Sequence, residues 1–252
     1  MSGPSFYKNV VPLDRERHRK LRLRTDGGVR FAAGTHFVPL AAVELYEAAR
    51  EYPVVFTGGD DATPVAILGL RAGENLYVDA NGRWAQGAYV PVFVRRYPFI
   101  LSRTEPGSTD FAVCIDESFD GLSDTEGLPL FDDEGNESEL VNRAVGLLRD
   151  ALTEGERTRR FIERLKALDL LTVQSMQVKD AAGRTYAMRD FRMVDENKLK
   201  ALDNDVLGDL NRAGYLGCIY AHLVSLGNVT RLAFRVPADE SAGSPAAASQ
   251  AS

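Results

Sequence analysis

Aromatic rings and two adjacent arginines are concentrated in one stretch of the sequence, GRWAQGAYVPVFVRRYPF, at residues 82–99. Its candidate ligand- or partner-binding side chains are Trp84, Tyr89, Arg95, Arg96 and Tyr97. An arginine pair beside aromatic faces binds a carboxylate or a phosphate through forked hydrogen bonds and stacking. The alternative is structural: the rings would fill the core, and the arginines would pair with the acidic side chains of residues 104–142. The sequence leaves both interpretations open.

The three histidines, His18, His36 and His222, form no HxH or HExxH pattern, so the spacing of a metal site is missing. His18 stands between arginines, where we expect it to be solvated. His222 ends an apolar stretch and follows Tyr220 by two positions. A structural histidine is the simpler interpretation there, but a neutral imidazole could also act as a base. We therefore include His222 among the candidate site residues.

Other catalytic and cofactor motifs are incomplete. The GGDDATP stretch lacks the GK[ST] of a phosphate-binding loop, and neither GxSxG nor SxxK occurs. Asp132 begins a stretch similar to a calcium loop, but its sixth and twelfth positions are Glu137 and Arg143. Cys114 and Cys218 lie in apolar runs and are expected to be buried thiols. The sequence predicts no metal ion and no cofactor, and it favours a non-enzymatic protein while leaving that question open.

The composition is that of a globular protein, with 44% hydrophobic and 26% charged residues in a chain of 252. The net charge of -6 is unevenly distributed: residues 1–30 are basic, and residues 104–142 hold twelve acidic side chains and no basic one. This balance gives no reason to expect a nucleic-acid partner. No apolar run approaches the roughly 20 residues of a membrane helix, and the N-terminus lacks a secretory pattern. We expect a cytoplasmic protein without membrane insertion. A secretion signal recognised by a dedicated export system would not be detected by the pattern of an ordinary signal peptide.

Hydrophobic periodicity predicts an α+β fold. In the N-terminal half we expect a helix at 39–50, an antiparallel meander of strands at 53–56, 65–70 and 76–78, strands at 99–102 and 111–115, and an acidic surface loop at 116–135. The stretch AYVPVFVRRYPF fits either a short helix with Pro91 in its first turn or an edge strand, and we favour the helix. Capping-box patterns at Asn136 and Thr153 predict a central pair of helices, 136–152 and 153–168; one kinked helix over the same residues would also fit the pattern. Leu147, Leu148, Phe161 and Ile162 should join this pair to the sheet.

The last third predicts a C-terminal unit of hairpin, helices, strand and helix. Its elements are the hairpin at 171–194, helices at 195–202 and 205–213, a buried strand at 215–222, and a final helix at 226–235 capped by Ser225. The expected organisation is a basic extended segment at 1–30, one α+β domain at 31–236 with candidate sub-lobes 31–135 and 136–236, and a disordered tail at 237–252.

The sequence resembles the SapC family of bacterial proteins. The resembling pieces are FAAGTHFVPLAAVELYEAAREYPVVF, GRWAQGAYVPVFVRRYPFIL, VDENKLKAL and LNRAGYLGCIYAHLVSLGNVTRL, which run collinearly through most of residues 6–236. The YVPVFVRRYPF and YAHLVSLGN blocks are the most specific. The family is named after a surface-layer gene cluster, and its members are often encoded near TonB-dependent receptors, tryptophan-halogenase-like proteins and cupin-like oxygenases. The resemblance therefore implies a halogenase-like or transport-related partner, but it carries over no catalytic residue.

Three functional hypotheses follow. The first is a non-enzymatic accessory or binding protein that holds a peptide, a small anionic ligand or a protein partner through the aromatic and arginine residues. The second is an enzyme or oxygenase-associated component acting on a peptide or an amino-acid-derived small molecule. The third is a structural surface-layer protein. We favour the first, and the sequence leaves the oligomeric state open.

Overall fold

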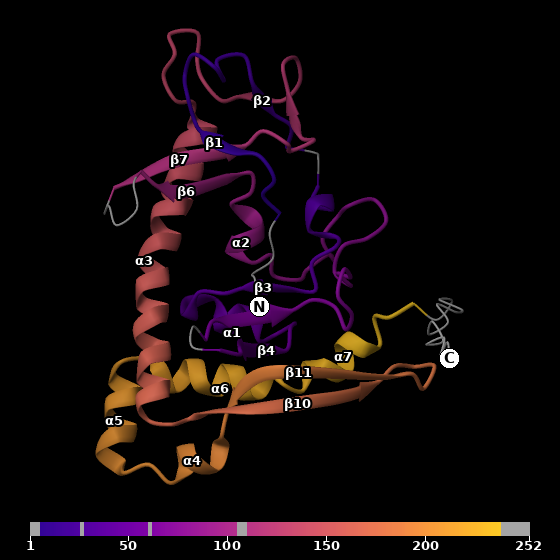
Figure 1. The fold of residues 1–252 in the computed structure, drawn as a ribbon, viewed down its shortest axis with the longest axis vertical. Helices are drawn as coiled ribbons and strands as arrows, with labels where there is room; N and C mark the ends of the chain where they lie inside the picture. Colours follow the sequence, from indigo (N-terminus) through magenta and orange to yellow (C-terminus); the bar gives the residue numbers. More distant parts are fainter. Residues whose placement is uncertain (1–5, 26–27, 60–61, 105–109, 238–252) are drawn as a thin grey trace, which may run out of the picture.

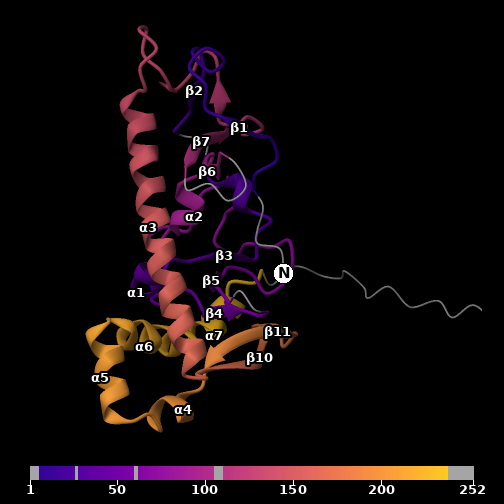
Figure 2. The same ribbon diagram turned by 60° about the vertical axis from the view of Figure 1, so that its left-hand side comes forward.

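One long helix, α3 (Glu139–Ala167), runs along one side of the molecule and connects its two layers (Figure 1). A computed structural model describes residues 6–25, 28–59, 62–104 and 110–237. The second view shows α3 passing both layers from the β1–β7–β6 region to the β10–β11 hairpin (Figure 2). Helices and antiparallel strands are both present in these residues, which confirms the predicted α+β class.

The larger layer is a five-stranded antiparallel sheet with helices packed around it. Its strand order is β10 (Leu171–Lys179), β11 (Thr185–Val194), β4 (Val54–Thr57), β5 (Pro64–Ile67) and β3 (Phe37–Pro39). The accompanying helices are η1 (Arg30–Ala32), η2 (Ala42–Glu44), α1 (Leu45–Ala48), α4 (Glu196–Lys200), α5 (Asn204–Arg212), α6 (Tyr215–Ser225) and α7 (Asn228–Ala233). Together they bury the main hydrophobic core, which includes Phe56, Phe161 and Ile219.

The smaller layer holds two three-stranded antiparallel sheets. One has the order β1 (Val10–Pro12), β7 (Phe111–Asp116) and β6 (Phe99–Arg103), and the other β8 (Leu122–Ser123), β2 (Arg22–Leu23) and β9 (Leu128–Pro129). Leu148 of α3 packs with Phe99, Ile115 and Leu130 in a second hydrophobic core. The short helix α2 (Val92–Arg95) lies between the two layers (Figure 1).

The predicted central pair of helices is wrong, because both predicted helices belong to α3. Ser138 caps its start by accepting a hydrogen bond from the backbone N–H of Val141. Thr153 does not begin a second helix: its hydroxyl donates to the carbonyl of Arg149, one turn earlier in the same helix. Glu156 pairs with Arg159 at 2.8 Å instead of closing a capping box. Pairs spaced three or four residues apart support a continuous helix.

The predicted strand at 215–222 is also wrong, because this stretch forms α6. The stretch is apolar on nearly all sides, and periodicity alone does not separate a short buried strand from a buried helix. Its buried residues, Cys218, Ile219, His222 and Ser225, follow helical spacing. The C-terminal unit is therefore a hairpin followed by four helices, and Ser225 ends α6 instead of capping α7.

Two N-terminal expectations also change. The helix expected at 39–50 is shorter, with Phe37–Pro39 forming β3 and the helical turns of η2 and α1 covering only residues 42–48. The expected strand at 76–78 contributes only the isolated bridge between Val78 and Trp84. The hairpin at 171–194, the strands after Pro98 and the helices after Asp195 are confirmed.

The basic N-terminal segment packs against the acidic stretch that the sequence places in a surface loop. β1 pairs with β7, and β2 lies between β8 and β9. His18 is buried, not solvated as predicted, and its Nε2 lies 3.1 Å from the Glu117 carboxylate.

Most of the predicted disordered tail, residues 238–252, lies outside the described residues. Within the described ranges, no helix has both the length and the apolar character needed to span a bilayer.

Candidate functional site

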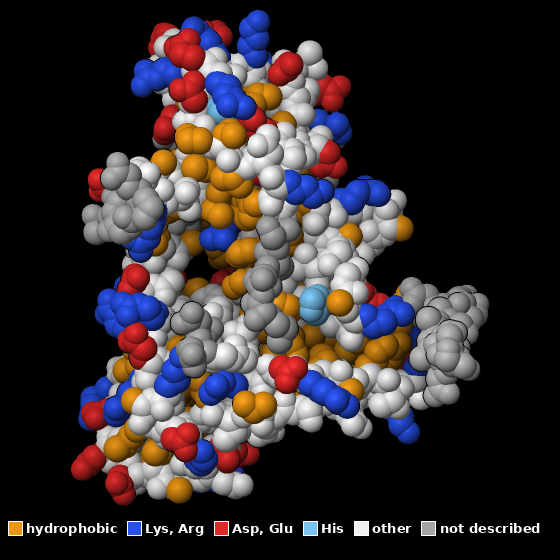
Figure 3. All heavy atoms as spheres, in the orientation of Figure 1, with side chains coloured by type: hydrophobic (Ala, Val, Ile, Leu, Met, Phe, Trp, Pro, Cys, Tyr) orange, Lys and Arg blue, Asp and Glu red, His pale blue; other side chains and the backbone are white. Residues whose placement is uncertain are grey.

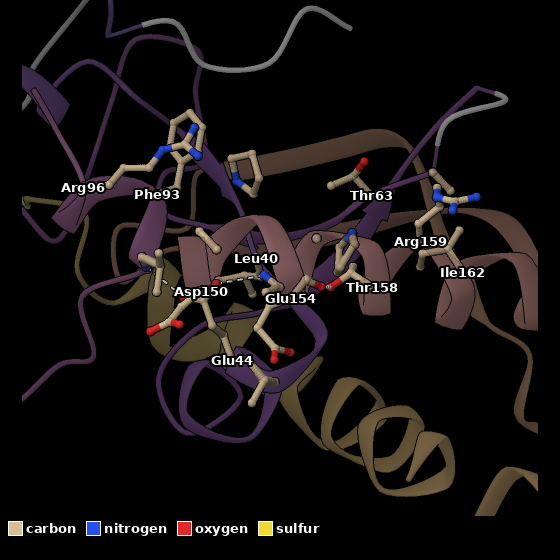
Figure 4. A pocket seen from close by; sticks show the side chains of 18 of the residues that line it. Leu40, Glu44, Thr63, Phe93, Arg96, Asp150, Glu154, Thr158, Arg159 and Ile162 are labelled. Atoms are coloured by element: carbon tan, nitrogen blue, oxygen red, sulfur yellow. Dashed lines mark hydrogen bonds between the residues drawn. The ribbon is translucent and has the colours of Figure 1, made fainter. Parts of the chain in front are cut away.

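A cavity of about 650 Å³ opens between α2, α3, η2 and β3, where the two layers meet. We call it the α2–α3 cavity. The space-filling view shows the molecule hollowed beside α3, with hydrophobic side chains on the wall above the hollow (Figure 3). In the close view, Arg96 and Phe93 lie at one end, and Arg159 and Ile162 lie at the other (Figure 4). The volume is within the range of small-molecule sites in proteins.

One stripe of α3 forms a wall of the cavity. Ala151, Gly155, Thr158 and Ile162 all line it, and their spacing of four, three and four residues places them on one helix face. Ala151 and Gly155 are small, and a Cβ added to Gly155 would meet no atom within 4 Å. The sequence therefore leaves room beside the middle of α3, where larger residues would fill the gap between the layers.

Glu44 and Thr158 hold the other walls in place. The buried carboxylate of Glu44 accepts hydrogen bonds from the backbone N–H groups of Ala41 and Val92, each at 2.8 Å, so it joins η2 to the start of α2. The Thr158 hydroxyl accepts a hydrogen bond from the N–H of Ala42 at 2.8 Å. These bonds satisfy backbone donors that helix starts leave open.

Arg95 lies on the rim of the cavity and is connected to Glu44 through Tyr89. The Tyr89 hydroxyl donates to Glu44 at 2.8 Å, and the Arg95 guanidinium lies 3.5 Å from the same hydroxyl. Burial, together with the negative charge of Glu44, raises the pKa of Tyr89 to about 12. Tyr89 therefore stays protonated at neutral pH, and the Arg95 side chain remains exposed to the cavity.

Arg96 stacks its guanidinium over the Phe93 ring, 4.5 Å from the ring centre. Its Nε is buried and has no hydrogen-bond acceptor among the described residues. The guanidinium also interacts with the Tyr7 hydroxyl, whose pKa is raised because burial outweighs the effect of that positive charge. A buried charged donor without an acceptor is costly for a protein to keep.

Of the other charged side chains on the rim, Glu154, Arg159 and Glu163 are paired within α3, whereas no ion pair of the described residues includes Asp150. Glu154 pairs with Arg157 at 2.6 Å, and Arg159 pairs with Glu163 at 2.8 Å. Among the ion pairs of the described residues, in contrast, none involves Arg95 or Arg96. The structure therefore presents two guanidinium groups at a cavity without a carboxylate within 4 Å in the part of the chain described.

Trp84 and Tyr97, the other aromatic candidates of the block, support the surrounding structure and do not line the cavity. Trp84 stacks on Tyr77 and donates its indole N–H to the Tyr52 hydroxyl at 3.0 Å. The Tyr97 ring packs on Phe31 with centroids 4.2 Å apart. Its hydroxyl donates to Asp116, and burial followed by that negative charge raises the pKa of Tyr97 above its ordinary value.

His222 does not belong to the cavity. It is fully buried under the main sheet, where Nδ1 lies 2.8 Å from the carbonyl oxygen of Val54 and Nε2 accepts the N–H of Val194 at 3.1 Å. Both ring nitrogens are thus used by the backbone, with the proton on Nδ1. Burial lowers the pKa of His222 to about 4. The imidazole stays neutral and holds α6 to β4 and β11, so the structure corrects its inclusion among the site candidates.

Several residues of the cavity were not predicted as site residues. Glu44 and the α3 stripe carry the walls, but they lie about 50 residues on either side of the arginine pair in the sequence. The available signals were a carboxylate among apolar neighbours in VPLAAVELY, and the small residues at 151 and 155 within an otherwise large apolar stripe.

Within the described ranges, no group of three or more His, Cys, Asp or Glu side chains could hold a metal ion.

Comparison with known proteins places the chain in a family. The family model named SapC matches residues 13–232, which is most of the chain. The chain belongs to the SapC family. No curated protein and no solved structure gives a significant match. The block 89–99 of this SapC-family chain forms α2 and one cavity wall, whereas the block 220–228 buries His222, Ser225 and Asn228 against the backbone of residues 49–54.

Proposed function

We propose that this SapC-family chain is a binding protein whose α2–α3 cavity holds a ligand with an anionic group. The ligand classes that suit the site are a peptide, a small anionic molecule or a segment of a partner protein. The observation that supports the proposal is the pair of guanidinium groups at the cavity, neither of which pairs with a carboxylate of the described residues. A carboxylate or phosphate would give Arg95 and Arg96 the anionic partner that the described residues do not supply.

The surrounding structure prepares this site before a ligand arrives. Glu44 fixes the start of α2, and the Phe93 ring supports the Arg96 guanidinium. Positioning by side chains that are already ordered lowers the entropy lost on binding. The apolar part of the cavity adds contact area beside the charged rim, as in other ligand sites.

The oxygenase-type alternative was motivated by the gene neighbourhood of the family and by His222 beside Tyr220, with His222 as a candidate base. Since both ring nitrogens of His222 are bonded to backbone groups inside the core, we do not propose this role. The surface-layer hypothesis stays a prediction that export and self-assembly measurements would test.

The test compares two probes that differ only in charge: the dipeptide N-acetyl-Phe-Leu with a free C-terminal carboxylate, and its C-terminal amide. We expect calorimetric titration of the wild-type protein to show at least tenfold tighter binding of the carboxylate, because a charge-assisted hydrogen bond contributes about 1.5–3 kcal/mol. The double variant Arg95→Gln/Arg96→Gln should lose this preference.

A matched control removes two charges elsewhere. Arg143 and Arg149 lie on α3 outside the cavity, so Arg143→Gln/Arg149→Gln changes the net charge equally. This control should keep the preference for the carboxylate. Equal binding of both probes by the wild type, or an equal loss in both double variants, would contradict the proposed function.

A further inference from the structure

We infer that the ligand of the α2–α3 cavity is a single long aliphatic chain with an anionic head group, of the fatty-acid type. This inference rests on the proposed function, because it places the head group at Arg95 and Arg96. It adds the class of ligand and the path of its chain along α3 toward Ile162.

The shape of the cavity is elongated along the helix. Its lining runs from Leu147 to Lys166 of α3, which is 20 residues, or about 28 Å from first to last at a rise of about 1.5 Å per residue. A second hollow of about 220 Å³ adjoins it and shares Arg96, Ala151 and Gly155 with it. Arg96 therefore lies where the two hollows adjoin.

The walls on both sides of this junction are apolar. Leu40, Val92, Phe93, Leu147, Ala151 and Ile162 line the larger hollow. Leu101, Phe111, Leu148 and Leu152 line the smaller one. A hydrocarbon chain gains free energy from leaving water against such walls, roughly in proportion to the apolar area that it buries.

The hydrogen-bond inventory of the walls favours an aliphatic chain over a peptide. The backbone groups of α3 are used within the helix. The N–H groups of Ala41 and Val92 donate to Glu44, and that of Ala42 donates to Thr158. A peptide in the cavity would bury its own amides against walls whose backbone donors are already occupied, and burying an amide without a partner is unfavourable. An aliphatic chain has no amides to satisfy.

The charges of the walls agree with one anionic end. At the far end of the cavity, Arg159 and Glu163 neutralise each other at 2.8 Å. At the opposite end, where Arg96 lies in Figure 4, neither Arg95 nor Arg96 has an ion pair among the described residues. The head group is therefore expected at the arginines, with the chain extending over Gly155 and Thr158.

The binding experiment uses butanoate, octanoate and dodecanoate below their micelle concentrations, with dodecanol and dodecyl phosphate as head-group controls. Displacement of a fluorescent fatty acid should show affinity rising with chain length, by up to about fourfold for each added methylene. Dodecanoate should bind at least tenfold tighter than dodecanol. If dodecyl phosphate binds as tightly as dodecanoate, the site accepts anionic head groups in general. If dodecyl phosphate binds more weakly, the site is selective for carboxylates. Both results support the inference.

A pair of glycine variants tests the path of the chain. Gly155→Leu places a side chain on the shared wall of both hollows, whereas Gly146→Leu makes the same change on α3 at a position that lines neither. An added Cβ meets no atom within 4 Å at either glycine, so both variants should fold, which circular dichroism checks. We expect Gly155→Leu to weaken dodecanoate binding at least tenfold and Gly146→Leu to leave it unchanged.

The outcomes separate this inference from the proposed function. If the dipeptide carboxylate binds through Arg95 and Arg96, but affinity does not rise with aliphatic chain length, the inference is overturned and the proposed function stands. If Gly155→Leu and Gly146→Leu weaken binding equally, the chain does not follow α3 and the inference is also overturned. If no probe depends on the two arginines, both proposals fall.

Discussion

Two regions of the molecule are rich in arginine, and they differ in whether their arginines form ion pairs with carboxylates. In the N-terminal region, Arg17 pairs with Glu117 at 2.6 Å, and Arg24 lies 3.8 Å from Glu126. At the α2–α3 cavity, Arg95 and Arg96 have no carboxylate partner among the described residues. The acidic stretch, which one of the two interpretations paired with Arg95 and Arg96, supplies Glu117 and Glu126 to the basic N-terminal segment.

This difference separates groups that build the fold from groups left for a ligand. Asp116 and His222 show how buried polar side chains of the interior obtain hydrogen-bond partners. Asp116 accepts hydrogen bonds from five donors, and both ring nitrogens of His222 bond to the backbone. Buried polar groups are normally satisfied in native proteins. The exceptions among the described side chains are the Nε atoms of Arg96 and Arg192, and of these two arginines Arg96 lines the cavity.

The largest effect on the free energy of unfolding is expected from removing the Asp116 carboxylate, which lies in the region whose charged groups are paired. Burial by itself would raise the pKa of Asp116, but hydrogen bonds from Ser118, Lys8 and Asn9 outweigh it and hold that pKa below its usual value. Asp116→Ala leaves these buried donors without an acceptor, so we expect a loss of about 3–4 kcal/mol in the free energy of unfolding. Urea unfolding at pH 7 measures it.

The exposed Asp124 provides the control for this prediction, because Asp124→Ala should change stability by less than about 0.5 kcal/mol. The stabilisation by Asp116 should be complete above the ordinary aspartate pKa and should be lost as the pH falls through the lowered pKa of the folded state. A small effect of Asp116→Ala would show that the N-terminal segment is held mainly by other contacts.

A middle-sized effect is expected from the pH dependence of His222. Its pKa is about 4 in the folded protein, against 6.5 when unperturbed, so the unfolded chain takes up the proton first as the pH falls. Stability due to this group is therefore complete above pH 6.5 and declines between pH 6.5 and 4. Between pH 7 and pH 5 the loss should be about 2 kcal/mol.

His222→Gln removes the titrating group, and its stability should lack this part of the pH dependence. Urea unfolding of both proteins at pH 7, 6 and 5 isolates the difference, because the carboxylates titrate alike in both. Parallel curves for the two proteins would mean that the imidazole is not held neutral in the core.

The smallest effect distinguishes the two kinds of arginine directly. Arg17→Ala removes an exposed ion pair and should cost about 0.5–1 kcal/mol, with the difference shrinking at high salt. Arg95→Ala removes no ion pair of the described residues and should change stability by less than about 0.5 kcal/mol. Chemical denaturation at low and high salt checks both variants. A larger loss for Arg95→Ala than for Arg17→Ala would identify Arg95 as part of the fold.

Local sequence patterns determined the α+β class, the β10–β11 hairpin and the helices that follow Asp195. For the stretch after Pro91 they favoured the helix, which the structure has as α2, over an edge strand. Alternating residues, a capping aspartate and a proline act on their immediate neighbours, so these features need no knowledge of distant contacts. The concentration of aromatic and arginine residues in 82–99 was equally visible in the sequence, and so was the buried character of Phe161, Ile162 and Leu148.

Only the tertiary structure decided which charges meet and where space remains. Whether the acids of 104–142 pair with Arg17 and Arg24 or with Arg95 and Arg96 depends on strand pairing between β1 and β7, some 100 residues apart. The cavity arises because α3 continues past Thr153 between two separate cores, with Ala151 and Gly155 at the gap. Charge matching and packing are non-local, whereas helix and strand patterns are local, and for that reason the sequence indicated the groups of this site but not their surroundings.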